Sequence, residues 1–294
     1  MKTIIRKKIH TKWLPIAILI TSILMFASCQ RDKNNPAEKY ADNGTRLSRN
    51  ALKLVTDLSQ NANAQEFNSE SMKILNSSSP ETYVMKSDSG SIPDWQFLNM
   101  NYAFKCLEKV FMAYELQLDS KISTNNANLG EKLLAACNAL DSVSMSETLL
   151  VKNAGLKKGL SSGRYRIEGS VFQVTDMYAE VWDEFAQHYL KSQMDIQKNY
   201  ENGVKNIPVS TFNTEMIKSK IDEPYSNNAV LVNLYKLRLI RDNQDKYNAL
   251  KTRIDKISES FTLILQIQGE QIKRNQNKLK LHELNDALEV LLVN

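Results

Sequence analysis

The sequence predicts an all-α fold, an antiparallel helical bundle with a long C-terminal helix. Three observations predict it. The 294 residues include only nine glycines and six prolines, the residues that most often break helices. Apolar residues recur at steps of three and four along much of the chain, which is the spacing of one helix face. Residues 226–294 contain a single glycine and no proline.

Residues 1–28 are left out of this fold, because they have the order of a secretory signal. A basic stretch comes first, and an apolar run over residues 13–26 follows it. As a helix this run is about 21 Å long, which is short for a hydrocarbon core of about 30 Å. The small residues Ala27 and Ser28 come next. We therefore expect a signal peptide that exports the chain and is then cleaved.

Phe26-Ala27-Ser28-Cys29 resembles the lipobox of bacterial lipoproteins, although Phe26 stands where leucine is commoner. The resemblance implies that Cys29 is acylated, with palmitate among its chains, and becomes the first residue after cleavage. The residue after the acylated cysteine is Gln30 and not an aspartate. By the same resemblance, this implies sorting to the outer membrane of a double-membraned bacterium. In the alternative, the apolar segment stays attached as a membrane anchor and Cys29 is only its edge.

Removal of residues 1–28 also removes the net charge. The whole chain has 38 basic and 33 acidic residues. Five basic residues and no acidic residue belong to the signal, so 33 of each sign remain. This balance gives no support for a strongly basic surface of the kind that binds nucleic acid, and we expect no nucleic-acid partner. The five are Lys2, Arg6, Lys7, Lys8 and Lys12.

Residues 29–44 have almost no apolar side chains after Cys29, so we expect a flexible tether between anchor and body. Residues 45–206 are expected to form a helical bundle. Thr45 can cap a helix whose apolar residues recur as far as Leu58, and a second short helix is expected near residues 66–75.

Residues 77–94 are rich in Ser, Pro and Gly and are expected to form a loop. The strongest helix signal follows, over residues 94–122. It has a second apolar row on another face, so this helix is expected to lie centrally, with neighbours on both sides. The first row comprises Phe97, Met100, Phe104, Leu107, Phe111, Tyr114 and Leu118.

Residues 123–128 are expected to form a short turn, and the next helix begins at Leu129 and continues toward Lys152. Four glycines are then expected to break the pattern across residues 155–169, with a brief strand at residues 164–168. Helix resumes at Ser170 and continues to about residue 202, because apolar residues again step by three and four.

Residues 207–294 are expected to form a long-helix region that packs on the bundle or extends it. A short helix near residues 211–221 ends before Glu223-Pro224. Apolar residues from Ile240 to Ile264 then fit a heptad frame with one polar exception, Asn243. This frame is too short for an independent coiled coil and suits a long bundle helix.

Cys106 and Cys137 are expected to be separate, buried and reduced. If the helices that flank residues 123–128 are antiparallel, the two cysteines are offset by about seven residues, or about 10 Å along the axis. A disulfide requires Cα atoms within about 7 Å.

We expect no catalytic residue, no metal site and no cofactor. Residues 159–163 match the Gly-x-Ser-x-Gly pattern of a nucleophile elbow, but no strand precedes them and no helix follows at once, so we interpret them as a glycine-rich loop. His188 continues the apolar row of Val181 and Phe185 and is expected in the core or at its edge, bonded to a neighbour. No His or Cys cluster has metal-ligand spacing.

Four basic residues lie close together near the C-terminus: Lys273, Arg274, Lys278 and Lys280. The simpler interpretation is a solvated helix face, and the sharper one is contact with an anionic partner such as cell-wall polymer or lipid headgroups.

The sequence supports two functional hypotheses. In the first, the protein is a non-enzymatic lipoprotein of the outer membrane, facing the periplasm or the cell surface, that acts as an assembly or tethering subunit of an envelope complex, with oligomerisation open. In outline it is similar to accessory lipoproteins of secretion machines such as the type VI system. In the second, it binds a ligand or cell-wall fragment in a pocket between helices.

Overall fold

The computed structural model describes residues 35–75, 92–119, 123–163, 165–218, 220, 228–273 and 277–293. All regular elements within these residues are helices, with no strand, so the predicted all-α class is confirmed. Residues 1–34, with the expected signal peptide and Cys29, lie outside the described residues. So does most of the expected loop at residues 77–94.

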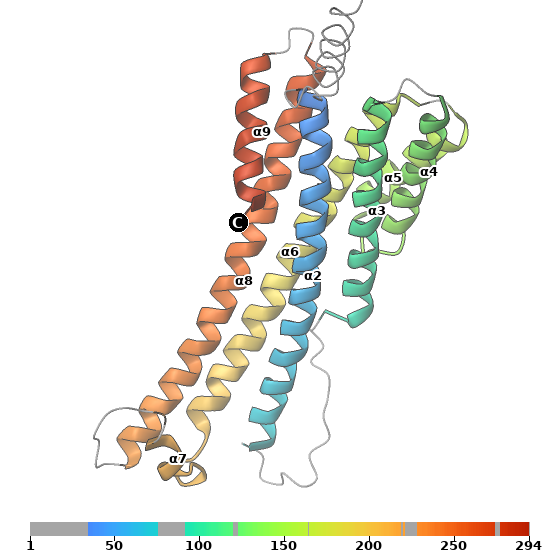
Figure 1. Cartoon of the computed structure of the whole chain (residues 1–294). Coiled ribbons are helices and arrows are strands. Elements are labelled where there is room, and N and C mark those ends of the chain that lie inside the picture. Colours follow the sequence, from blue (N-terminus) through green and yellow to red (C-terminus); the bar gives the residue numbers. More distant parts are fainter. Residues whose placement is uncertain are drawn as a thin grey trace, which may run out of the picture.

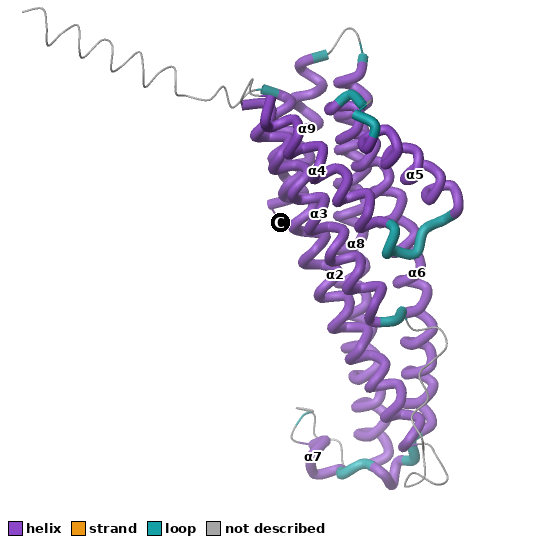
Figure 2. Tube along the Cα trace, turned by 90° about the vertical axis from the view of Figure 1, so that its right-hand side faces the viewer, coloured by secondary structure: helices purple, strands orange, loops and turns teal. Residues whose placement is uncertain are grey.

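Three long helices run side by side along the molecule, and the shorter ones apart from α7 lie against their upper part (Figure 1). The long helices are α2, α6 and α8. Helices α3, α4 and α5 lie on one side of them, α9 packs against both α8 and α2, and α7 lies at the far end (Figures 1 and 2). The bounds are α2 Pro36–Leu75, α3 Asp94–Asp119, α4 Ser123–Leu140, α5 Glu147–Ser161, α6 Ile167–Asn206, a 3-10 turn η2 Val209–Thr211, α7 Thr214–Lys218, α8 Asn228–Ile272 and α9 Lys278–Val293.

One large apolar core occupies the upper part of the bundle. It is rich in aromatic rings, and Tyr40, Phe104 and Trp182 are among its largest fully buried side chains. Two small clusters, one around Tyr200 and one around Ile217, lie toward the end that carries α7. Most of the apolar burial that stabilises the fold is therefore at the end where α2 begins.

The prediction of a flexible tether over residues 29–44 is wrong for residues 36–44, because α2 begins at Pro36. Asn35 caps this helix: its side-chain oxygen accepts a hydrogen bond from the Ala37 amide at 3.1 Å. Proline at the first helical position already has a helical φ. Tyr40 and Ala41 are fully buried, so a few well-placed apolar residues hold a segment whose average composition is polar.

Helix α2 also continues through residues 59–65, where the sequence predicted a gap between two helices. Gln65 explains part of this continuity. It is buried, and its amide donates a 2.5 Å hydrogen bond to the side-chain oxygen of Asn243 on α8. Asn243, the polar exception in the heptad frame, is therefore a buried contact between two helices.

The one turn expected in this part of the chain is displaced. Residues 123–128 are the first turns of α4 rather than a loop. The next break comes at residues 141–146, between α4 and α5, where the sequence predicted continuous helix. There the Ser142 hydroxyl donates to the Ala139 carbonyl at 2.7 Å and satisfies one of the last carbonyls of α4.

The expected glycine-rich break at residues 155–169 is wrong over most of its length. Helix α5 continues through Gly155 and Gly159 to Ser161, and residues 165–168 form no strand because α6 begins at Ile167. Only Gly163, with φ +69°, adopts a backbone conformation that favours glycine.

The long C-terminal helix is α8, which ends at Ile272, and α9 begins at Lys278 and packs against it. The region expected at residues 207–294 therefore contains two packed helices, α8 and α9, and among its described residues also the short η2 and α7. The expectation for the cysteines is confirmed, since Cys106 and Cys137 are both free and buried. None of the described helices has the length and apolarity needed to cross a bilayer.

Candidate functional site

Three of the four basic residues predicted near the C-terminus, Lys273, Lys278 and Lys280, lie where α8 ends and α9 begins, a place we call the α8–α9 turn. Lys273 and Lys280 share one carboxylate: their ammonium groups lie 2.7 and 2.9 Å from Oε1 of Glu270. These hydrogen bonds hold the pKa of Glu270 below its usual value. Lys278 is exposed, and Arg274 lies outside the described residues. The structure therefore joins two of the four predicted residues through an acidic residue that the sequence analysis did not select.

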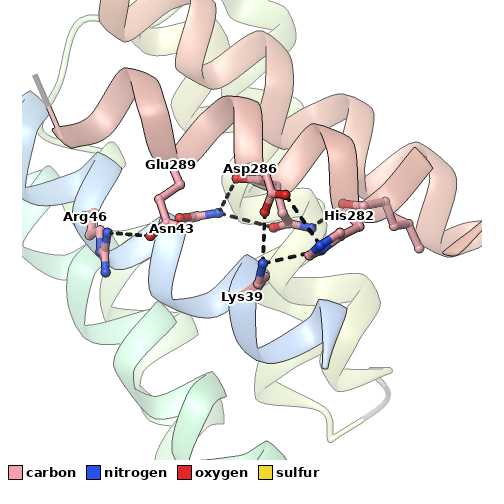
Figure 3. Close-up of polar contacts among 8 residues, drawn as sticks. Lys39, Asn43, Arg46, His282, Asp286 and Glu289 are labelled. Atoms are coloured by element: carbon pink, nitrogen blue, oxygen red, sulfur yellow. Dashed lines mark hydrogen bonds and ion pairs between the residues drawn. The ribbon is translucent and has the colours of Figure 1, made fainter. Parts of the chain in front are cut away.

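A polar seam connects α9 to the beginning of α2 (Figure 3). The ammonium of Lys39 lies 2.9 Å from Oδ1 of Asp286 and 3.4 Å from Nδ1 of His282. The ion pair lowers the pKa of Asp286. One helix turn further, the Asn43 amide donates to the side-chain and backbone oxygens of Asn285, both at 3.2 Å.

The seam also fixes the register of the two helices. Asn43 pairs with Asn285, and the Asn50 amide donates to the Leu292 carbonyl at 3.0 Å, so both pairs are separated by 242 residues. A constant separation means that α2 and α9 run parallel. By the same separation, Pro36 at the start of α2 is level with Lys278 at the start of α9.

A pocket of about 750 Å³ lies between α5 and α6. Leu156 and Met177, both buried, are among the residues that line it. Three glycines contribute to the hollow because they have no side chains; a Cβ added at Gly155 would meet no atom within 4 Å. The lining glycines are Gly155, Gly159 and Gly169.

The polar groups of this pocket carry both signs of charge. Lys152 lines it and forms an ion pair with Glu180. Asp176 lies beside this pair, and burial followed by the repulsion of Glu180 raises the pKa of its carboxyl. Arg166 and Tyr165 line the pocket from the chain before α6. The arrangement is suited to holding a small polar molecule.

The other residues considered in the sequence, Ser161 and His188, do not share a site in the structure. Ser161 of the Gly-x-Ser-x-Gly pattern is the exposed last residue of α5. His188 is exposed rather than in the core or at its edge, and lines a separate hollow of about 310 Å³ with Glu184. The helix turns it outward because Val181, Phe185 and Tyr189 occupy the buried face.

A third candidate is an exposed row on α3 that the sequence analysis missed. Trp95, Leu98 and Tyr102 stand on one face, and the side chain of Leu98 is 67% exposed. At the same steps of three and four, the row continues through Lys105 and Lys109 to Met112 and Leu116, all exposed. We call these seven residues the α3 row. Its length is about 32 Å, and its spacing was visible in the sequence beside the buried rows of the same helix.

Among the described residues, no group of three or more His, Cys, Asp or Glu side chains could hold a metal ion. No family model, no curated protein and no solved structure matches this chain.

Proposed function

We propose that this protein is an outer-membrane lipoprotein, anchored through acyl chains on Cys29, that acts as a non-enzymatic assembly or tethering subunit of an envelope protein complex. The observation that carries the proposal is the α3 row. The anchor rests on the resemblance of residues 26–29 to a lipobox. The proposed complexes include secretion machines such as the type VI system.

The α3 row has the properties of a helix-docking face. Trp and Tyr are enriched at the centres of protein interfaces, where one large ring excludes much water. An apolar row at steps of three and four matches the face that a partner helix presents in coiled-coil packing. Trp95, Leu98 and Tyr102 would form the apolar anchor of such a contact.

The two lysines in the middle of the row define the partner further. A second copy of α3 in full overlap would place Lys105 and Lys109 against lysines, in either helix direction, and such like-charge contacts are destabilising. A partner helix with Asp or Glu at these positions would instead form ion pairs. We therefore propose a different envelope protein, with an amphipathic helix that is acidic at its middle.

Site-specific photo-cross-linking in intact cells tests this proposal. A photoreactive amino acid at Leu98 should give one adduct with a defined envelope protein. The same substitution at Leu237 on α8, whose side chain is 61% exposed, is the matched control and should give none. Tyr102→Glu should abolish the Leu98 adduct. An equal set of adducts from both positions, or none from Leu98, would contradict the proposal.

The anchor has its own test. Cys29→Ala should release the protein from membranes or leave it unprocessed, measured by fractionation and by the mass of the chain. A Cys29→Ala variant that is cleaved and still anchored would refute the lipoprotein assignment.

The α5–α6 pocket supports a second candidate function, binding of a small ligand or cell-wall fragment. The supporting observation is that Asp176, Arg166 and Tyr165 line one hollow. Thermal-shift measurements with a panel of soluble cell-wall fragments should then show a stabilising fragment. Gly155→Leu, which fills the pocket, should abolish that shift, whereas Gly269→Leu, at an equally open helical glycine on α8, should not. Equal shifts in both variants would exclude this pocket.

A further inference from the structure

We propose that the end of the bundle formed by the α8–α9 turn and the start of α2 lies directly against the anionic phospholipid headgroups of the anchoring membrane. This inference rests on the proposed acylation of Cys29. It assigns a membrane-facing surface and an orientation to the bundle.

The length of the chain between anchor and bundle selects this end. Cys29 precedes Pro36 by seven residues, which span at most about 25 Å when fully extended. Helix α2 has 40 residues and is about 60 Å long, so its other end is too far from the acyl chains for the tether alone to bring it to the membrane. Pro36 is level with Lys278 in the register of α2 and α9, so the α8–α9 turn is at the near end.

The charge of the turn complements phosphate headgroups. Of the described residues between Glu270 and Glu283, three are lysines, Lys273, Lys278 and Lys280, and the acidic ones are Glu270 and Glu283. Lys273, Lys278 and Lys280 are exposed. Because Glu270 holds Lys273 and Lys280 at 2.7 and 2.9 Å, two of these ammonium groups are positioned at the turn rather than free to spread. Basic clusters near a bilayer are attracted to its anionic lipids.

Two exposed apolar side chains flank the same lysines. Ile272 is 70% exposed and Leu279 is 68% exposed, one on each side of the turn. Apolar side chains beside lysines are the composition of surfaces that insert shallowly into the headgroup region. A solvated helix face would account for the lysines but not for Ile272 and Leu279. The combination with the short tether is what favours a lipid surface.

The test uses the full lipidated protein in vesicles of phosphatidylcholine with phosphatidylglycerol, and in vesicles of phosphatidylcholine alone. Lysine acetylation by an amine-reactive reagent is followed residue by residue with mass spectrometry. In the phosphatidylglycerol vesicles, acetylation of Lys273, Lys278 and Lys280 should slow by about fivefold, the factor expected for a lysine near an anionic surface. High salt should remove this protection.

Exposed lysines on the lower part of the bundle are internal controls. Lys191 on α6, with Lys246 and Lys251 on α8, should react equally in both kinds of vesicle. Leu279→Asp should weaken the protection of Lys278, whereas Val293→Asp, at an equally exposed residue of α9, should leave it unchanged.

Equal reactivity of the turn lysines in both vesicle types would overturn the inference. So would protection found in cells and absent from the vesicles, which would indicate a protein partner at this surface. The mass of the Cys29 peptide separates the two proposals: an unacylated Cys29 contradicts the anchor, whereas an acylated Cys29 with unprotected lysines contradicts only the membrane contact.

Discussion

The side-chain amide of Gln268 donates a 2.7 Å hydrogen bond to the phenolic oxygen of Tyr40, inside the core and across 228 residues of sequence. The Tyr40 hydroxyl in turn lies 3.4 Å from Oγ1 of Thr175, which donates to the Val171 carbonyl at 2.9 Å. A short polar chain therefore connects α8, α2 and α6 in the interior, and it includes a residue of the segment that composition alone assigned to a tether.

This contact predicts a strong coupling between the two side chains. Tyr40→Phe leaves the buried Gln268 amide without its acceptor and should lower the free energy of unfolding by about 1–3 kcal/mol. Gln268→Met should be milder, because the Tyr40 hydroxyl keeps Thr175 as a partner. Urea unfolding of both single variants and the double variant measures the coupling. Strictly additive losses would show that the hydrogen bond contributes nothing.

Buried tyrosines predict alkaline instability. Burial raises the pKa of Tyr40, Tyr114 and Tyr178, and raises that of Tyr189 to about 12. Unfolded tyrosine ionises near pH 10, so above that pH the unfolded chain has released protons that the folded chain retains. The stabilisation is complete below about pH 10 and falls by about 1.4 kcal/mol per pH unit for each such tyrosine.

Urea unfolding at stepwise increasing pH, with tyrosinate absorbance as a second signal, measures this loss. Tyr189→Phe should make the fall above pH 10 less steep, because it removes one of the tyrosines whose pKa burial raises. Early ionisation of all tyrosines in the folded protein, without unfolding, would contradict the prediction.

The close packing of α2 against α3 requires glycine at position 44, because a larger side chain would clash with Phe111. A Cβ built at this position would lie 2.3 Å from the Phe111 ring, a separation that requires the ring or the helices to move. Gly44→Ala should therefore destabilise the fold by about 1–3 kcal/mol, despite the better helix propensity of alanine. Gly269→Ala on α8, where a Cβ meets nothing within 4 Å, should stabilise by about 0.5–1 kcal/mol. Thermal unfolding of the pair measures both signs, and two shifts in the same direction would refute the argument.

Periodicity predicted the parts of this fold that depend on repeated apolar contacts. The steps of three and four around Phe104 and Val181 mark helices that the structure contains, with both residues buried. Breaks were predicted less well, because glycine and polar residues break a helix only when its neighbours allow. Gly155 lies in α5 at an exposed helical position, and Gln65 continues α2 because Asn243 accepts its hydrogen bond.

The candidate surfaces show the same division. The lysines of the α8–α9 turn could be selected from sequence, but Glu270 could not, because its role depends on a turn that brings Lys280 back beside α8. The start of α2 was assigned to a tether since its average composition is polar, although Asn35-Pro36 is a recognisable helix beginning. The α3 row was present in the sequence as a third set of steps, and only exposure distinguishes Leu98 from the buried rows.

We expect the end of the bundle that carries α7 to depend on the buried ammonium of Lys236. Its ammonium donates to the carbonyls of Lys205 at 3.1 Å and Ile207 at 2.5 Å, which end α6, and lies 5.7 Å from the centre of the Phe212 ring. A cation is favourable at a helix C-terminus, where carbonyls lack amide partners. Lys236→Met should destabilise this end by about 1–2 kcal/mol and speed hydrogen exchange in α7 and the first turns of α8.

The matched control is Lys246→Met, at an exposed lysine of the same helix, which should change stability by less than about 0.5 kcal/mol. Because methionine also removes the desolvation penalty of a buried ammonium, the sign of the effect is informative. A Lys236→Met variant more stable than the parent, with unchanged exchange in α7, would mean that the ammonium opposes folding here and that the packing of Ile217 and Leu231 alone holds this end together.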